Sequence, residues 1–185
     1  MIHSLKKTLL LCAVSLAGAT GLWAASDVVL FDFEGRNPLK GWTQDGEAFE
    51  VASASAPYYG RIPIKGVQDE QFLYSFDMLV RSNNPVGALT SPEFTIQRDH
   101  INFILGGNRG WPERLGVQLV VDSKVVRSST GRESRPAVSF NMLQLNWDVK
   151  EFKGKRAKIV FNDHTPYGTL AADHFVMSDT PQGWR

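Results

Sequence analysis

Residues 117–128 read VQLVVDSKVVRS, two short runs rich in β-branched residues that are joined by a very short connection. β-Branched residues favour strands, and two residues are the usual length of a tight hairpin connection. The stretch therefore predicts antiparallel strands at 117–121 and 125–128, with the turn at Asp122 and Ser123.

The same pattern recurs on both sides of this hairpin. Short apolar runs alternate with Gly, Pro, Asn and Asp, and none is long enough at a 3.6-residue period to predict a helix. We expect further strands at 28–33, 48–52, 72–78, 94–96, 101–105, 143–149, 157–161 and 174–177. This spacing predicts an all-β protein, an antiparallel β-sandwich of jelly-roll type, similar to concanavalin or galactose-binding domains.

Length and charge limit the possible functions. The chain has 185 residues, and its 20 Lys and Arg nearly balance its 19 Asp and Glu. This length fits one domain, and the charge balance argues against nucleic acid as a partner, because a protein that follows phosphates carries a basic excess.

The N-terminal residues 1–25 predict a secretory signal peptide. Lys6 and Lys7 precede an apolar run at 9–19, and small residues follow it. The run is too short to span a bilayer, so we expect no membrane span. Cys12, the only cysteine, lies inside the run, and cleavage would leave a domain at 26–185 without a thiol. The protein is therefore expected to be secreted or periplasmic.

A search for catalytic motifs finds few signals. No Gly-x-Ser-x-Gly motif occurs, and His100, His164 and His174 are not spaced as a zinc-binding pair. A glycosidase needs only two carboxylates at a set separation, which a sequence does not reveal. A small jelly-roll glycosidase or lyase therefore stays an alternative, and so does a purely structural surface module.

The aromatic residues separate into core and site candidates. Trp42 and Trp147 lie in strand-like contexts, which predicts that they belong to the core. Trp111 lies between Gly110 and Pro112 in a polar loop, where it would either stack on a sugar or plug the loop. The candidate carbohydrate-binding residues of this loop and of a second polar loop are Asn108, Arg109, Trp111, Asp163 and Tyr167.

Six stretches taken in order resemble a known family. They are 32–35 with 41–42, 89–96, 101–107, 120–127, 147–155 and 172–175. Together they resemble the non-catalytic β-sandwich module of bacterial secreted levanases and other members of glycoside hydrolase family 32. The resemblance implies a carbohydrate-binding or accessory role, with an extracellular polysaccharide such as fructan, or a carbohydrate-active enzyme, as partner.

The chain departs from this family in two places. The acids of the family's catalytic propeller are absent, since Arg98 and Asp99 are followed by His100 rather than by proline. The resemblance therefore implies no fructan hydrolysis by that machinery. The last loop lacks the family's tryptophan, and Tyr167 is the residue that would replace its ligand contact.

Many jelly-roll binding modules hold a structural calcium between an acid of the first strand and an acid of the last. Glu34 and Asp173 match those positions, so the resemblance implies calcium as a candidate cofactor. Ca²⁺ prefers six to eight oxygen ligands, so backbone carbonyls or water would have to complete the shell. The alternative is that both residues are ordinary acids at strand ends.

Overall fold

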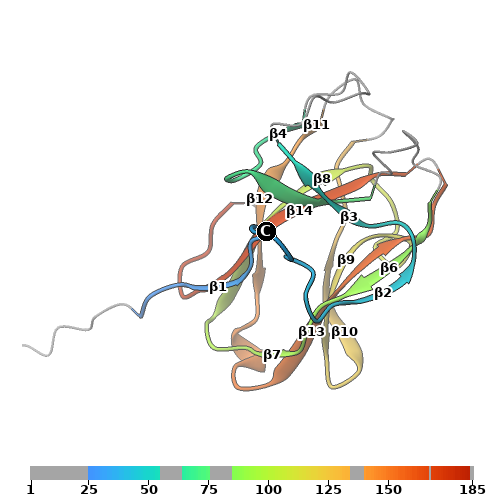
Figure 1. Cartoon of the computed structure of the whole chain (residues 1–185). Coiled ribbons are helices and arrows are strands. Elements are labelled where there is room, and N and C mark those ends of the chain that lie inside the picture. Colours follow the sequence, from blue (N-terminus) through green and yellow to red (C-terminus); the bar gives the residue numbers. More distant parts are fainter. Residues whose placement is uncertain (1–24, 55–63, 76–84, 134–139, 167, 184–185) are drawn as a thin grey trace, which may run out of the picture.

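The computed structural model describes residues 25–54, 64–75, 85–133, 140–166 and 168–183, which form two packed antiparallel sheets (Figure 1). The β14 sheet has the order β12-β8-β14-β5-β3, and β1 also pairs with β14. Its strands are β1 (Val28–Phe31), β3 (Glu50–Ser53), β5 (Gln71–Tyr74), β8 (His100–Gly107), β12 (Leu143–Asp148) and β14 (Leu170–Ser178).

The second layer, the β13 sheet, has the order β10-β9-β13-β6-β2, and β7 also pairs with β13. Its strands are β2 (Thr43–Gly46), β6 (Gly87–Thr90), β7 (Phe94–Thr95), β9 (Leu115–Val121), β10 (Lys124–Ser129) and β13 (Arg156–Asp163). A short parallel pair, β4 (Ile64–Lys65) with β11 (Phe140–Asn141), and one 3-10 turn, η1 (Lys150–Phe152), complete the described elements. The jelly-roll β-sandwich class is confirmed.

The predicted hairpin is present. β9 and β10 are antiparallel, with Val121 opposite Lys124. Asp122 and Ser123 have φ of 49° and 62°, the left-handed backbone that both central residues of a type I′ turn adopt. The turn therefore matches the twist of its two strands.

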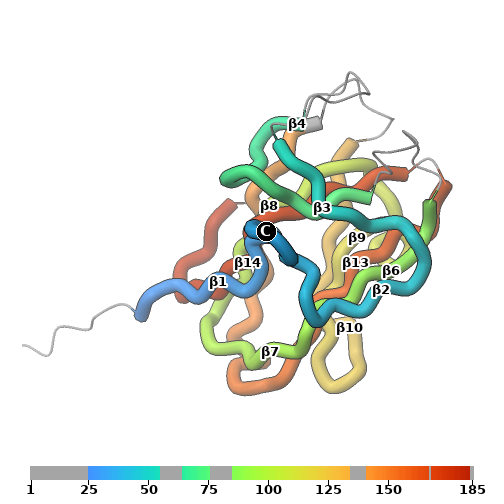
Figure 2. The backbone as a smooth tube through the Cα atoms, in the orientation of Figure 1, coloured from blue at the N-terminus to red at the C-terminus, as the bar shows by residue number. Residues whose placement is uncertain are grey.

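β14 is the strand on which the first sheet is organised. β8 pairs along one of its sides, while β5 pairs with its first half and β1 with its second half (Figure 2). Between these halves the register shifts after Asp173, and His174 takes a φ of 51°. The first and last strands are therefore neighbours, and the bulge in β14 marks the place where β1 and β5 meet.

Aromatic rings fill the space between the sheets. Phe103 stacks on Phe175 with centroids 4.9 Å apart, and Trp147 lies 4.5 Å from Phe103. The indole Nε1 of Trp147 donates to Ser129 Oγ at 2.9 Å, so the buried ring has its polar atom satisfied. The core placement of Trp147 is confirmed, and the half-buried Trp42 packs against the same core.

Several strand predictions needed correction. β2 reads TQDG and is exposed throughout, so it carries no apolar signal, and the short strands β4, β6 and β11 were also missed. The expected strand at 101–105 is longer at both ends in β8, which reaches Gly107 because this residue pairs with Leu170. The expected strand at 72–78 covers β5, but residues 76–78 lie outside the described residues.

The outer face of the β14 sheet is covered. Phe72, Tyr74 and Ile104 are buried there in a cluster with Met142, and Ile64 of β4 packs against it. Farther along, the side chain of Asn102 donates to Thr180 O at 3.0 Å and accepts from Gln182 N at 2.9 Å. The C-terminal segment 180–183 therefore lies across this face.

The outer face of the β13 sheet differs. Its side chains at alternate positions are half-buried or exposed, among them Thr90, Gln118, Val120, Lys158 and Val160.

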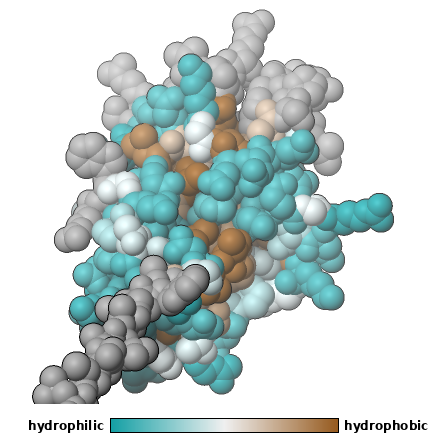
Figure 3. All heavy atoms as spheres, turned by 90° about the vertical axis from the view of Figure 1, so that its left-hand side faces the viewer, coloured by the Kyte–Doolittle hydropathy of each residue, from teal (hydrophilic) through white to brown (hydrophobic). Residues whose placement is uncertain are grey.

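On the side of the molecule drawn in Figure 3, hydrophobic atoms of the described residues gather in small patches between hydrophilic ones. Among the helices of the described residues, none has the length and apolar character to cross a membrane.

Candidate functional site

Trp111 lies in the loop between β8 and β9, and 73% of it is exposed. It is the most exposed of the large hydrophobic residues among those described. Arg109 and Arg114 are also exposed, and Asn108 is half-buried. The structure therefore places the predicted ring at the surface, beside the polar side chains that the sequence indicated.

The backbone on both sides of Trp111 is held in place. Its carbonyl accepts from the amides of Arg114 and Leu115, both at 2.7 Å. Thr130 Oγ1 accepts from Gly110 N at 3.0 Å and donates to Leu115 O at 2.7 Å. A ring that is exposed on a fixed backbone needs little ordering when a ligand binds.

The second predicted loop, after β13, contacts the first. His164 N donates to Arg114 O at 2.6 Å, and Asn162 Nδ2 donates to Pro112 O at 3.2 Å. Asn108 N donates to Thr169 O at 2.8 Å. The fold therefore joins two loops that are more than 50 residues apart in the sequence. Tyr167, in the second loop, lies outside the described residues.

Asp163 is fully buried beneath these loops. Its Oδ1 accepts from Thr165 N at 3.3 Å and from Thr165 Oγ1 at 3.2 Å, while its Oδ2 has no partner among the described residues. Burial raises the pKa of the Asp163 carboxyl, although the nearby polar groups of Ser75 and Thr165 oppose the shift. Its side chain supports the second loop and is closed to a ligand in solvent.

The Trp111 loop stands at one end of the outer face of the β13 sheet. Pro112 lies over Gly116 of β9, where an added Cβ would be 2.8 Å from the Cα of Pro112. Asn162 also donates to Gln118 Oε1 at 3.2 Å, so the two amides on the outer side are joined, with Asn162 buried and Gln118 half-buried. Sequence reasoning missed Gln118 and Asn162, although each occupies a polar outward position in a strand with apolar inward residues.

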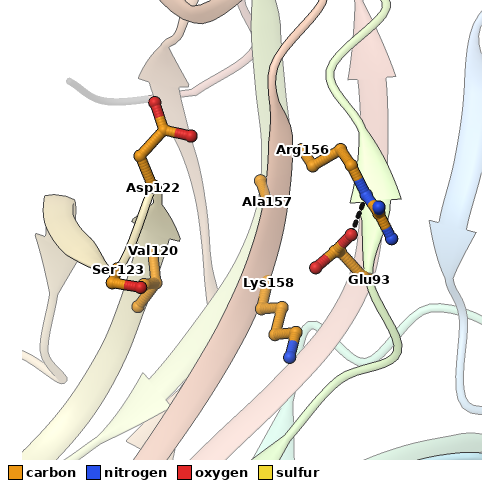
Figure 4. A pocket seen from close by; sticks show the side chains of 7 residues that line it. All are labelled: Glu93, Val120, Asp122, Ser123, Arg156, Ala157 and Lys158. Carbon is orange, nitrogen blue, oxygen red and sulfur yellow. Dashed lines mark ion pairs between the residues drawn. The ribbon is translucent and has the colours of Figure 1, made fainter.

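A groove of about 380 Å³ lies on the same face toward the opposite end of β13 (Figure 4). Arg156 forms an ion pair with Glu93, and Lys155, just outside the groove, pairs with Asp122 at 3.1 Å. Lys158 has no ion pair with any residue that the structure describes. The groove is lined by Glu93, Val120, Asp122, Ser123, Arg156, Ala157 and Lys158.

Glu34 and Asp173 hold the same segment at the β14 bulge. Glu34 Oε1 accepts from Glu70 N at 3.0 Å and from Gln71 N at 2.6 Å, and Asp173 Oδ2 accepts from Gln68 N at 2.8 Å. The predicted pair of acids therefore shares one loop.

Asp173 is an unusual carboxyl because it is buried and one of its oxygens, Oδ1, has no partner among the described residues. Burial, with the nearby charges of Glu34 and Asp69, raises the pKa of Asp173 to about 7 against the opposing amides of Gln68 and His174. In the described part of the chain, no three His, Cys, Asp or Glu side chains are grouped to hold a metal ion.

Comparison with known proteins gives one sequence relative and several structural neighbours. The chain is 29% identical over 160 residues, 84% of its length, to "Putative glycosyl hydrolase ecdE" of Aspergillus rugulosus. It spans only 22% of that protein. No protein-family model matches the sequence.

Among solved structures, the K2 cleaved adhesin domain of Lys-gingipain is similar at a TM-score of 0.54, with 14% identity, covering 83% of this chain and 98% of that domain. TmCBM61, solved with beta-1,4-galactotriose, is similar at 0.46, with 14% identity and coverage of 80% and 98%. The chain therefore shares its sandwich fold with the adhesin domain and a stretch of sequence with a larger protein named as a glycosyl hydrolase.

Proposed function

We propose that this protein is a non-catalytic carbohydrate-binding or accessory module, related to those of levanase-type glycoside hydrolases. The observation that carries the proposal is Trp111, an exposed ring on a fixed loop. The similarity to about a fifth of a larger protein named as a glycosyl hydrolase supports an accessory role. Fructan is one candidate ligand, and a carbohydrate-active enzyme is a candidate partner.

The chemistry of the loop suits a sugar. An aromatic face offers an apolar surface of negative potential to the C–H bonds of a pyranose or furanose ring. Arg109 and Asn108, close in the same loop, offer guanidinium and amide groups for hydroxyls. In this proposal Asp163 positions the loop that carries Tyr167, and Tyr167 adds a second contact.

The predicted signal peptide supports a secreted or periplasmic location, where such polysaccharides are found. Residues 1–24 lie outside the described residues, so this location stays a prediction from the sequence. N-terminal sequencing of the exported protein tests it, with cleavage expected after Ala24 or Ala25.

Trp111→Ala tests the binding site. We expect affinity for the bound glycan to fall by about 1 kcal/mol, roughly fivefold, with an unchanged melting temperature, because the ring contributes stacking and little core packing. Affinity electrophoresis against levan, inulin, pectin and sulfated algal polysaccharide measures the loss. Val29→Ala, another exposed apolar residue, is the control and should change neither property. Unfolding of Trp111→Ala would instead identify the ring as a structural plug.

A glycosidase is the second candidate function, because the sequence relative is named as a glycosyl hydrolase. A reducing-sugar assay on the same polysaccharides separates the two candidates. Release of sugar would favour the enzyme, and retardation without release favours the binding module.

Calcium at Glu34 and Asp173 is a further part of the proposal. The oxygen of Asp173 that lacks a partner and the adjacent negative charge of Glu34 favour a cation there. With only two carboxylates, backbone carbonyls and water would supply the remaining oxygen ligands. The ion would have a structural role, joining β1, β14 and the segment before β5.

A further inference from the structure

We propose that the groove lined by Lys158 binds a negatively charged substituent of the glycan, a carboxylate or a sulfate ester, while Trp111 stacks on another sugar of the same chain. The inference rests on the proposed carbohydrate-binding function and names the class of polysaccharide. It follows from the shape of the groove, from its charges and from its position on the open face of the β13 sheet.

The groove lies between β13, the end of β9 with the turn that follows it, and Glu93. β6 pairs with β13 at Val160 and β7 pairs with it at Ala157. Between them, Ser91 hydrogen bonds to Ile159 through N and Oγ, both at 2.9 Å, and the chain then reaches Glu93. The side chain of Lys158 lines the groove, with Val120 of β9 opposite it in register.

The charges of the groove leave one cation for a ligand. Arg156 is paired with Glu93, and Lys155 is paired with Asp122. Lys158 is exposed and has no ion pair with a residue in the described ranges. A negatively charged group would complete this arrangement, while a neutral hydroxyl would gain only a hydrogen bond to the ammonium.

Val120 gives the groove an apolar wall next to the ammonium group. The wall suits the C–H face of a sugar, and the ammonium suits a charge at the rim of that sugar. An acidic sugar combines both features in one residue. This combination favours an acidic polysaccharide over a free inorganic anion.

The open face connects the groove to the Trp111 loop. Asn162, which holds Pro112, and Lys158 both point outward from β13 and are four residues apart, or about 13 Å along a strand. Between them lie Val160 of β13 and Gln118 of β9. A single polysaccharide chain lying along β13 can therefore contact the Trp111 loop and Lys158 together.

Two matched pairs of polymers test the proposal. Polygalacturonate carries carboxylates that are neutralised in its methyl ester. κ-Carrageenan carries sulfate esters that its desulfated form lacks. We expect wild-type protein to bind at least one charged polymer more tightly than its neutral counterpart, with affinity falling as salt rises. Isothermal titration calorimetry at low and high salt measures this difference. Comparison of the two charged polymers distinguishes a carboxylate from a sulfate.

Lys158→Gln identifies the groove as the site of charge recognition. The variant should bind the preferred charged polymer about fivefold more weakly and lose most of the salt dependence, with unchanged binding of the neutral form. Lys65→Gln is the matched control, an exposed strand lysine on β4, and should bind as wild type.

The contrary outcomes separate a failure of this inference from a failure of the proposed function. Equal binding of charged and neutral polymers, or a loss in Lys65→Gln as large as in Lys158→Gln, overturns the inference and leaves the proposed function in place. Binding of none of these polymers, nor of levan or inulin, contradicts the proposed function itself and the inference with it. An unchanged melting temperature of Lys158→Gln excludes misfolding as the cause of a loss.

Discussion

The outer faces of the two sheets differ, because other parts of the chain cover the outer face of the β14 sheet and leave the outer face of the β13 sheet open to solvent. β8 of the β14 sheet is buried along its whole length, because other parts of the chain cover its outer side. β13 of the other sheet alternates between exposed and buried residues over most of its length. A sheet with apolar residues on both faces requires a cover, while an alternating strand can keep one face in water.

The covers of the closed face also differ from each other. Phe72 and Ile104 bury apolar area beneath β4, while Asn102 and Asn146 use side-chain amides to hold the backbone of residues 180–183. The first cover is driven by the hydrophobic effect and the second by hydrogen bonds. The closed face therefore contributes to stability, and the open face is available for binding.

Truncation of a ring on the closed face should have the largest effect. Phe72→Ala is expected to lower the free energy of unfolding by about 3 to 5 kcal/mol, the usual cost of emptying a buried aromatic site. Val160→Ala on the open face should cost about 1 kcal/mol or less. Urea unfolding of both variants measures the difference. Equal losses would show that the open face is covered in solution.

Asp173, at the β14 bulge, gives a pH dependence of stability in metal-free protein. The pKa of Asp173 is about 7 in the folded protein, against an ordinary value of 3.8. Between these two pH values the folded state therefore keeps a proton that the unfolded state releases. Stability should therefore fall as pH rises from about 4 to about 7, by roughly 4 kcal/mol at most. Asp173→Asn should remove most of this slope in chelator-treated samples. A slope that persists in this variant would assign the effect to other groups.

Calcium should counteract that loss, because it favours the ionised carboxylates. At about 100 times its dissociation constant it would add roughly 2.7 kcal/mol to stability at neutral pH. Glu34→Gln should reduce the gain and leave the metal-free stability equal or higher, since it removes a neighbouring like charge. Melting curves of verified metal-free protein measure both effects. Melting curves that respond to neither calcium nor chelator would show that both acids only hold the loop by hydrogen bonds and bind no calcium.

Removal of an amide on the closed face should have a smaller effect than truncation of a ring there. Asn102→Ala breaks two hydrogen bonds to residues 180 and 182 and is expected to cost about 1 to 3 kcal/mol. Hydrogen exchange of the Gln182 amide should accelerate more than exchange in β13. Asn141→Ala, an exposed asparagine of β11, is the control and should change neither. Unchanged exchange at Gln182 would show that segment 180–183 is held by other contacts.

The sequence alone was sufficient for the fold class and for the clearest local elements. The hairpin at Asp122 and Ser123 and the core position of Trp147 follow from residue types and their near neighbours, whereas the sequence left open whether Trp111 is exposed or plugs its loop. These features depend on backbone preferences and on hydrophobic patterning over a few residues, which are local properties. Polar edge strands such as β2 carry no such signal and were missed.

Only the tertiary structure decided which surface is open. The cover of the β14 sheet comes from β4 and from residues 180–183, and the groove at Lys158 is lined by residues of three segments that are distant in sequence, Glu93, 120–123 and 156–158. Asp163, predicted as a ligand contact, is buried because it occupies an inward-facing position of β13, as Ile159 and Phe161 do. Such placements depend on contacts between residues distant in sequence, and the pattern of one strand does not encode which segment will lie across it.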